Sequence, residues 1–160
     1  MFIGLVSAFL VMVADQISKW FIWDYLSHTE RVLEVTSWFN LVAAWNTGVS
    51  FSMLNDMGNV GVYVLSLFAL IVIGMLLYWL CKEKSRVMQM ALGFVIGGAV
   101  GNVIDRVRLG AVFDFLDVHV GVHHWPAFNV ADSFICIGAT LIVCHGVFVG
   151  KCRCNKVKSV

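Results

Sequence analysis

The sequence predicts an all-α membrane protein with four transmembrane helices and a small extracytoplasmic β-rich cap. Hydrophobic residues make up 60% of the 160 residues and charged residues only 13%, whereas a soluble domain is typically about 25% charged. In addition, four segments are long and apolar enough to cross a hydrocarbon core about 30 Å thick, which requires roughly 20 helical residues. The length fits a single integral membrane domain, residues 1–160.

The first predicted span, residues 2–23, is the only one that carries a cluster of polar residues. It lacks a basic segment before its apolar stretch and a small-residue cleavage site, so we interpret it as a retained span and not a signal peptide. The cluster consists of Asp15, Gln16, Ser18 and Lys19.

The other three predicted spans are almost free of ionisable groups. Residues 57–81 and 87–104 contain no charged residue, and residues 133–150 contain a single histidine. The connection over residues 24–56 is rich in β-branched and aromatic residues, which predicts short strands within about 30–51. The second long connection, 105–132, is expected to contain a loop over the site at 118–126.

Basic residues are concentrated in the segments that lie on one side of the membrane if the spans alternate. The KEKSR segment, 82–86, contributes three and the tail, 151–160, contributes four, against Arg31, Arg106 and Arg108 on the other side. The positive-inside rule therefore predicts that both termini are cytoplasmic and that both long connections face outward.

This orientation brings the costly polar residues of the spans together near the outer interface. Asp15 and Lys19 share one helix face in the outer half of the first span. Asp105 and Arg106 end the third span, and Asp132 begins the fourth. A charge in the hydrocarbon costs several kcal/mol by most scales, so ionisable residues at this depth indicate a functional site.

Each of these residues also has a purely structural interpretation. Asp15 and Lys19 are spaced as a helical ion pair, and Asn129 with Asp132 is spaced as an N-cap with its acidic partner. Asp105 is spaced to form a local salt bridge with Arg108. The residues themselves do not decide among Asp105, Asp114 and Asp117 as reacting acids, although the adjacent Arg106 favours a permanently ionised Asp105.

Five ordered blocks of the chain resemble the lipoprotein signal peptidases, also called signal peptidase II. The blocks are ADQISKW at 14–20, WNTGVSF at 45–51, GNVIDR at 101–106, VFDF at 112–115 and FNVADS at 128–133. One departure is visible at Val49 and Ser50, where the family often has alanines. We expect that difference to affect packing and not activity.

The resemblance implies an intramembrane aspartic endopeptidase that cleaves prolipoproteins before a diacylglyceryl-cysteine. It implies Asp114 and Asp132 as the catalytic pair and requires no cofactor or metal. Two neighbouring carboxylates suit this chemistry because they can share one proton, so that one activates water while the other polarises the scissile carbonyl. The substrate-binding or supporting positions that it implies are Asp15, Lys19, Asn46, Gly48, Asn102, Asp105, Arg106 and Asn129.

The resemblance also sets the expected partners and location. The partners are lipid-modified prolipoproteins and membrane lipid, and the location is the bacterial cytoplasmic (inner) membrane, with the active site near the outer face. We expect a monomer. The net charge of +1 and the lack of a basic stripe predict no nucleic-acid partner.

Other classes of protein fit the sequence less well. A small proton-coupled transporter also needs intramembrane acids, but usually near the midplane and with repeat symmetry, which the sequence lacks. A zinc peptidase is suggested by His119, His123 and His124, but no H-E-x-x-H motif accompanies them. A non-enzymatic scaffold leaves the layer of acids unexplained.

Overall fold

A computed structural model describes residues 1–29, 31–48 and 59–157. Residues 49–58, which include Val49, Ser50 and the start of the second predicted span, lie outside the described residues. Four helices are each long and apolar enough to cross a membrane. They are α1 (Phe2–His28), α2 (Asn59–Lys82), α3 (Arg86–Leu109) and α4 (Val130–Val157).

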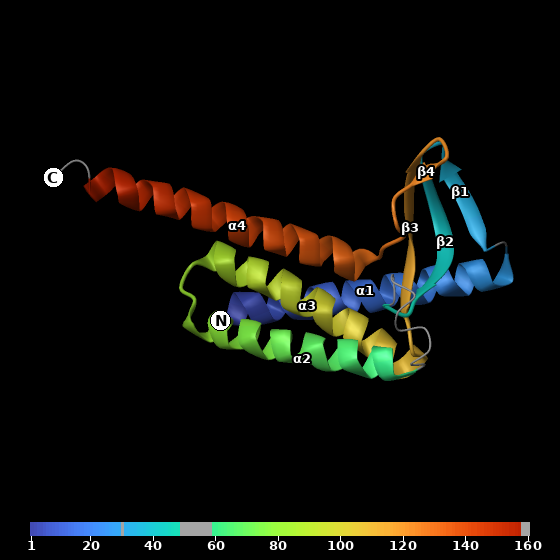
Figure 1. Cartoon of the computed structure of the whole chain (residues 1–160), viewed down its shortest axis with the longest axis horizontal. Coiled ribbons are helices and arrows are strands. Elements are labelled where there is room, and N and C mark those ends of the chain that lie inside the picture. Colours follow the sequence, from blue (N-terminus) through green and yellow to red (C-terminus); the bar gives the residue numbers. More distant parts are fainter. Residues whose placement is uncertain (30, 49–58, 158–160) are drawn as a thin grey trace.

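The central helix of the bundle is α3, which contacts each of the other three. Most of its apolar stretch is buried, whereas the other three helices leave most of theirs on the surface. Figure 1 shows α2 on one side of α3 and α4 running along another. The burial pattern identifies α3 as the core of the bundle and the outer surfaces of the other helices as its lipid-facing parts.

Glycines on α3 allow its neighbours to approach at backbone distance. A Cβ added to Gly93 or Gly97 would collide with the backbone of α1, and one added to Gly98 would collide with the Ala131 carbonyl of α4. Small residues are the usual means of close helix packing in lipid, where van der Waals contact replaces the hydrophobic effect. This packing brings the polar residues of α1, α3 and α4 within hydrogen-bonding range.

A four-stranded antiparallel sheet stands at one end of the bundle (Figure 1). Its order is β1 (Val32–Thr36), β2 (Phe39–Asn46), β3 (Val112–Val120) and β4 (His123–His124). Four helices with a small sheet were predicted, and this architecture is confirmed. The second connection, 105–132, also forms part of the sheet, although no strand was predicted there. The loop expected at 118–126 instead contains the end of β3 and all of β4.

The sheet attaches to the bundle through one of its faces. Phe113 and Phe115 of β3 form a buried cluster with Leu26 from the last turn of α1. This contact accounts for the extension of α1 to His28, beyond the predicted end at residue 23. Because side chains alternate along a strand, Asp114 projects from the opposite face of β3.

Candidate active site

A capping box begins α4 and fixes Asp132 at the helix N-terminus. The Asn129 side-chain oxygen accepts a hydrogen bond from the Asp132 backbone N–H at 2.9 Å. In return, the Asp132 carboxylate accepts from the Asn129 backbone N–H at 3.3 Å. The cap interpretation of this motif is therefore correct for the local structure. It also orients one carboxylate oxygen of Asp132 and leaves the other for a different partner.

A buried ion network joins α1, α3 and the start of α4. The Lys19 ammonium lies 2.8 Å from Asp15 and 2.7 Å from Asp105. Asp15 also accepts the backbone N–H of Ala131 at 2.9 Å, so α1 supplies a cap for α4. All three charged residues are buried. Asp105 is paired as predicted, but its partner is Lys19, because Arg106 and Arg108 form no ion pair among the described residues.

Gln16 belongs to this network and was not among the predicted site residues. Its side-chain nitrogen donates to Asp105 at 2.9 Å and lies 3.3 Å from the Gly101 carbonyl oxygen. A polar residue beside Asp15 in an otherwise apolar span was the available signal in the sequence. Its role is to complete the hydrogen bonding around Asp105.

Asp114 is held from two sides by amide groups. The Asn129 side chain donates to one carboxylate oxygen at 2.6 Å, and the Asn46 side chain donates to the other at 3.0 Å. The residue is only 2% exposed. Burial raises the pKa of Asp114 to about 6, the nearby Asp132 charge adds to the rise, and the two amide donors and Lys19 oppose it. This carboxyl group therefore retains a proton more readily than an ordinary aspartate.

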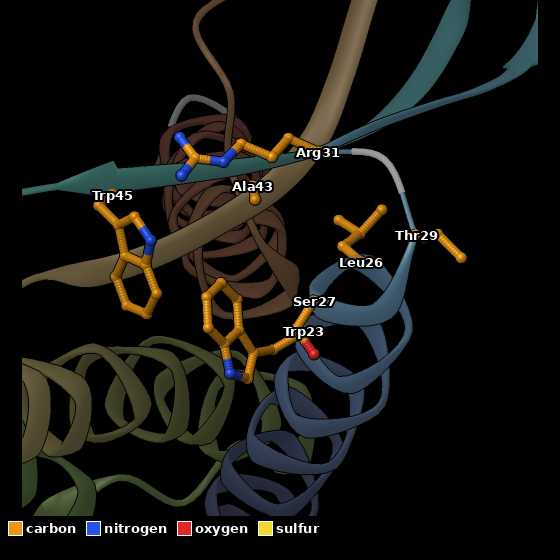
Figure 2. Close-up of a pocket in the computed structure, with 7 residues that line it drawn as sticks. All are labelled: Trp23, Leu26, Ser27, Thr29, Arg31, Ala43 and Trp45. Atoms are coloured by element: carbon orange, nitrogen blue, oxygen red, sulfur yellow. The ribbon is translucent and has the colours of Figure 1, made fainter.

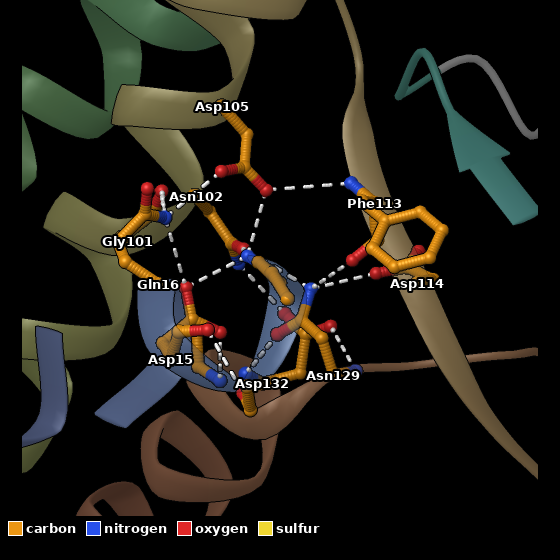
Figure 3. A network of polar contacts seen from close by, with 12 residues as sticks. Asp15, Gln16, Gly101, Asn102, Asp105, Phe113, Asp114, Asn129 and Asp132 are labelled. Atoms are coloured by element: carbon orange, nitrogen blue, oxygen red, sulfur yellow. Dashed lines mark hydrogen bonds and ion pairs between the residues drawn. The ribbon is translucent and has the colours of Figure 1, made fainter. Parts of the chain in front are cut away.

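Two asparagines connect Asp114 to Asp132 (Figure 3). The Asn129 amide nitrogen, which binds Asp114, also lies 3.2 Å from the Asn102 side-chain oxygen. Asn102 in turn donates to the free oxygen of Asp132 at 2.8 Å, and its oxygen accepts from Lys19 at 3.1 Å. The two acids thus share a continuous set of hydrogen bonds, one from β3 and the other from α4.

Two further predicted positions lie at the margin of this set. Gly48 has a positive φ of 82°, and its N–H donates to the Asn46 side-chain oxygen at 2.8 Å. The charges of Asp132 and Asp114 both act on the Arg106 guanidinium, whose buried Nε has no hydrogen-bond partner among the described residues. The structure therefore places Gly48 behind Asn46 and leaves Arg106 close to both acids without a direct bond to either.

Asp117, the third acid that spacing left open, belongs to a separate cluster. Its carboxylate lies 2.9 Å from His124 and accepts from Asn40 at 3.0 Å. Burial would raise the pKa of Asp117, but these hydrogen bonds and the nearby histidine charges hold it below the ordinary value. His119 stacks on His124. Among the described residues, no group of His, Cys, Asp or Glu side chains is arranged to hold a metal ion.

Comparison with known proteins gives a consistent family assignment. Residues 7–148 match the family model described as signal peptidase (SPase) II. A lipoprotein signal peptidase of Aeromonas hydrophila is 44% identical over 141 residues, which cover 87% of this chain and 84% of that protein. One of Teredinibacter turnerae is 43% identical over 149 residues, covering 90% and 86%.

Solved structures show the same similarity at the level of the fold. A structure described as a bacterial membrane enzyme, solved by the in meso method at 2.3 Å resolution, has a TM-score of 0.73 and 29% identity. The match covers 90% of this chain and 87% of the other. The shared fold therefore includes both the helices and the sheet.

Proposed function

Since this chain belongs to the signal peptidase II family, we propose that Asp114 and Asp132 are the catalytic pair with which it removes signal peptides from prolipoproteins. The family assignment makes the chain an aspartic peptidase and not the proton-coupled transporter that was the predicted alternative. One observation carries the choice of residues. Asp114 and Asp132 are linked through Asn129 and Asn102, and neither forms an ion pair among the described residues.

The surroundings of the pair suggest how the roles divide. Asp114 is buried with a raised pKa, which suits the acid that keeps the shared proton and donates it to the scissile carbonyl oxygen. Asp132 is half-buried at the positive end of α4, where a carboxylate is stabilised. It takes a proton from the attacking water. When the C–N bond of the resulting tetrahedral intermediate breaks, Asp132 gives the proton taken from water to the leaving amine of the lipid-modified cysteine. A hydroxyl of the intermediate returns its proton to Asp114 as the new carboxyl group forms.

The distribution of basic residues supports the location of the site near the outer face of the inner membrane. The chain is a multi-pass membrane protein with four candidate spans. The basic α2–α3 connection lies at the end of the bundle opposite the sheet (Figure 1). By the positive-inside rule that end is cytoplasmic, so the sheet, Asp114 and the start of α4 face outward. The prediction of a monomer remains untested.

Arg106 is proposed to contact the substrate. Its guanidinium lies near both acids without an ion pair of its own among the described residues. A substrate backbone carbonyl would complete its hydrogen bonding. Arg106→Ala is expected to lower kcat/KM about 100-fold, a typical cost for removing a positioned donor, and unchanged kinetics would exclude this role.

The decisive experiment is cleavage of a lipidated prolipoprotein by the purified protein in the presence of a chelator. Asp114→Asn and Asp132→Asn are expected to remain folded and to lose turnover, while the wild type cleaves with or without chelator. Asp117→Asn is the matched control, because Asp117 lies on the same strand and is also buried. Normal turnover in either of the first two variants, or inhibition by the chelator, would refute the assignment.

A further inference from the structure

An apolar groove runs along the start of α4 on the side that carries Asp132. It encloses about 400 Å³ between the segment that leads into α4 and the first turns of the helix. Its polar members are Asp132 and Ser133, and the Ser133 hydroxyl already donates to the Asn129 carbonyl at 2.9 Å. The lining residues are Trp125, Pro126, Ala127, Phe128, Asp132, Ser133 and Cys136.

The lining is poorly suited to a peptide. An extended backbone in the groove would bring N–H and C=O groups against a wall with few hydrogen-bonding partners, and unpaired buried backbone groups are costly. A helical segment satisfies its own backbone but is about 10–12 Å across with its side chains. A hydrocarbon chain has no polar group to satisfy and is much narrower. The chemistry of the wall therefore favours acyl chains.

The groove has the right position relative to the reaction. Because Asp132 forms part of its wall, an occupant lies directly beside the bond that the proposed pair cleaves. The lipid-modified cysteine of the substrate follows that bond immediately. By contrast, the cavity drawn in Figure 2, between Trp23, Arg31 and Trp45 under the sheet, is lined by neither Asp114 nor Asp132.

The groove is continuous with the lipid-facing surface of the protein. The groove ends at Cys136, the lining residue furthest along α4. Exposed residues continue from there at helical spacing, namely Cys136, Thr140 and Val143. α4 is one of the four candidate spans. A chain that leaves the groove at Cys136 therefore passes onto a helix surface already in contact with the bilayer.

We propose that this groove receives the acyl chains of the substrate's diacylglyceryl-cysteine and thereby places the scissile bond at the catalytic pair. This inference rests on the proposed function. Because lipid tails are already in an apolar medium, moving them into the groove gains little hydrophobic free energy. The groove acts through its shape, and it selects a substrate whose lipid emerges on the α4 side of the pair.

The first test fills the groove from an exposed position. Cys136→Trp is expected to raise KM about tenfold for a diacylglyceryl substrate in bilayer nanodiscs, and to raise it less for a substrate with one acyl chain. Ile137→Trp is the matched control, because Ile137 is the neighbouring exposed residue and does not line the groove. Equal effects of the two variants, or equal effects on the two substrates, would overturn the inference.

A second measurement identifies the occupant directly. A diazirine near the carbonyl end of the acyl chain is expected to label residues 125–136 of Asp114→Asn protein, which retains uncut substrate. Labelling of that segment from a diazirine in the signal peptide instead would assign the groove to the peptide and overturn the inference. If Asp114→Asn and Asp132→Asn keep normal turnover, the proposed function fails, whatever the groove variants do.

Discussion

Two pairs of acids lie in the same polar layer, and the structure treats them differently. Asp15 and Asp105 share the ammonium of Lys19 at 2.8 and 2.7 Å. Asp114 and Asp132 instead accept hydrogen bonds from asparagine amides at 2.6 to 3.0 Å. The first pair shares one cation, which balances one of its two negative charges. The second pair is positioned by neutral amides, which supply no counter-charge, so its two carboxyl groups share the negative charge between them.

The difference separates structural acids from reacting ones. Both acids of the first pair lie within 2.8 Å of a buried ammonium, and a buried ion pair of this kind suits a structural role. Two neighbouring carboxylates held by neutral donors, one buried and one half-buried, cannot both ionise cheaply, so the pair retains a proton. Asn102 joins the halves, since it accepts from Lys19 and donates to Asp132. The ion network of Asp15, Lys19 and Asp105 thus positions Asn102, which in turn positions Asp132.

The largest expected effect is loss of catalysis when both proposed reacting acids are replaced. Asp114→Asn, Asp132→Asn and the double variant should each lower kcat by about 10⁴-fold or more. The double variant should lose little beyond either single one, because the two groups act as a unit. Single-turnover cleavage assays provide the measurement, and multiplicative losses would show that the acids act independently.

The next largest effect should come from removing the cation. Lys19→Met leaves Asp15 and Asp105 buried without a counter-charge and should destabilise the protein by about 3–5 kcal/mol. Thermal unfolding in detergent measures the loss, with the exposed loop residue Lys84 as the matched control, replaced by Met. If Lys19→Met unfolds at the same temperature as Lys84→Met, the ion network does not stabilise the fold.

The two kinds of acid should also differ in how pH affects stability. The pKa of Asp114 is raised from 3.8 to about 6 in the folded protein. The stability that protonated Asp114 contributes is therefore fully present below the unfolded pKa, and it is lost as the pH rises through about 6. Relative to Asp114→Asn, the wild type should lose up to about 3 kcal/mol between pH 4 and 8. Unfolding of both proteins across this range measures the difference.

Asp117→Asn provides a control of opposite sign for that experiment. The folded pKa of Asp117 is lowered, so its contribution is present above the ordinary pKa and is lost as pH falls. Relative to Asp117→Asn, the wild type should therefore lose stability on acidification below about pH 4. A parallel pH dependence for the two variants would contradict the proposed difference between the acids.

The smallest effect is expected from Gln16, which supports the ion network with a neutral hydrogen bond. Gln16→Ala should destabilise the protein by about 1 kcal/mol, the usual net worth of such a bond. It should leave kcat unchanged, because Gln16 contacts Asp105 and neither reacting acid. Paired unfolding and cleavage measurements would test this, and a large fall in kcat would place Gln16 in the reaction.

The sheet shows where sequence reasoning stopped short. Residues 112–120, VFDFLDVHV, are rich in valine and phenylalanine, a composition typical of strands, but their apolar and polar side chains do not alternate regularly. Their partner strand, β2, lies about 70 residues earlier, with Ala44 opposite Asp114. A strand signal cannot by itself identify so distant a partner, and that pairing brings Asn46 to Asp114.

The amino-acid sequence by itself determined the four spans and the collection of charged residues in one layer, because both depend on local composition and on alternation across a membrane. It could not decide which acids are paired with a cation. Asp105 pairs with Lys19, and not with the arginines near it in the sequence, because glycines on α3 let α1 approach closely. Asp15 reaches the backbone of Ala131, 116 residues away. Such pairings depend on how the helices pack, and packing is a property of the tertiary structure.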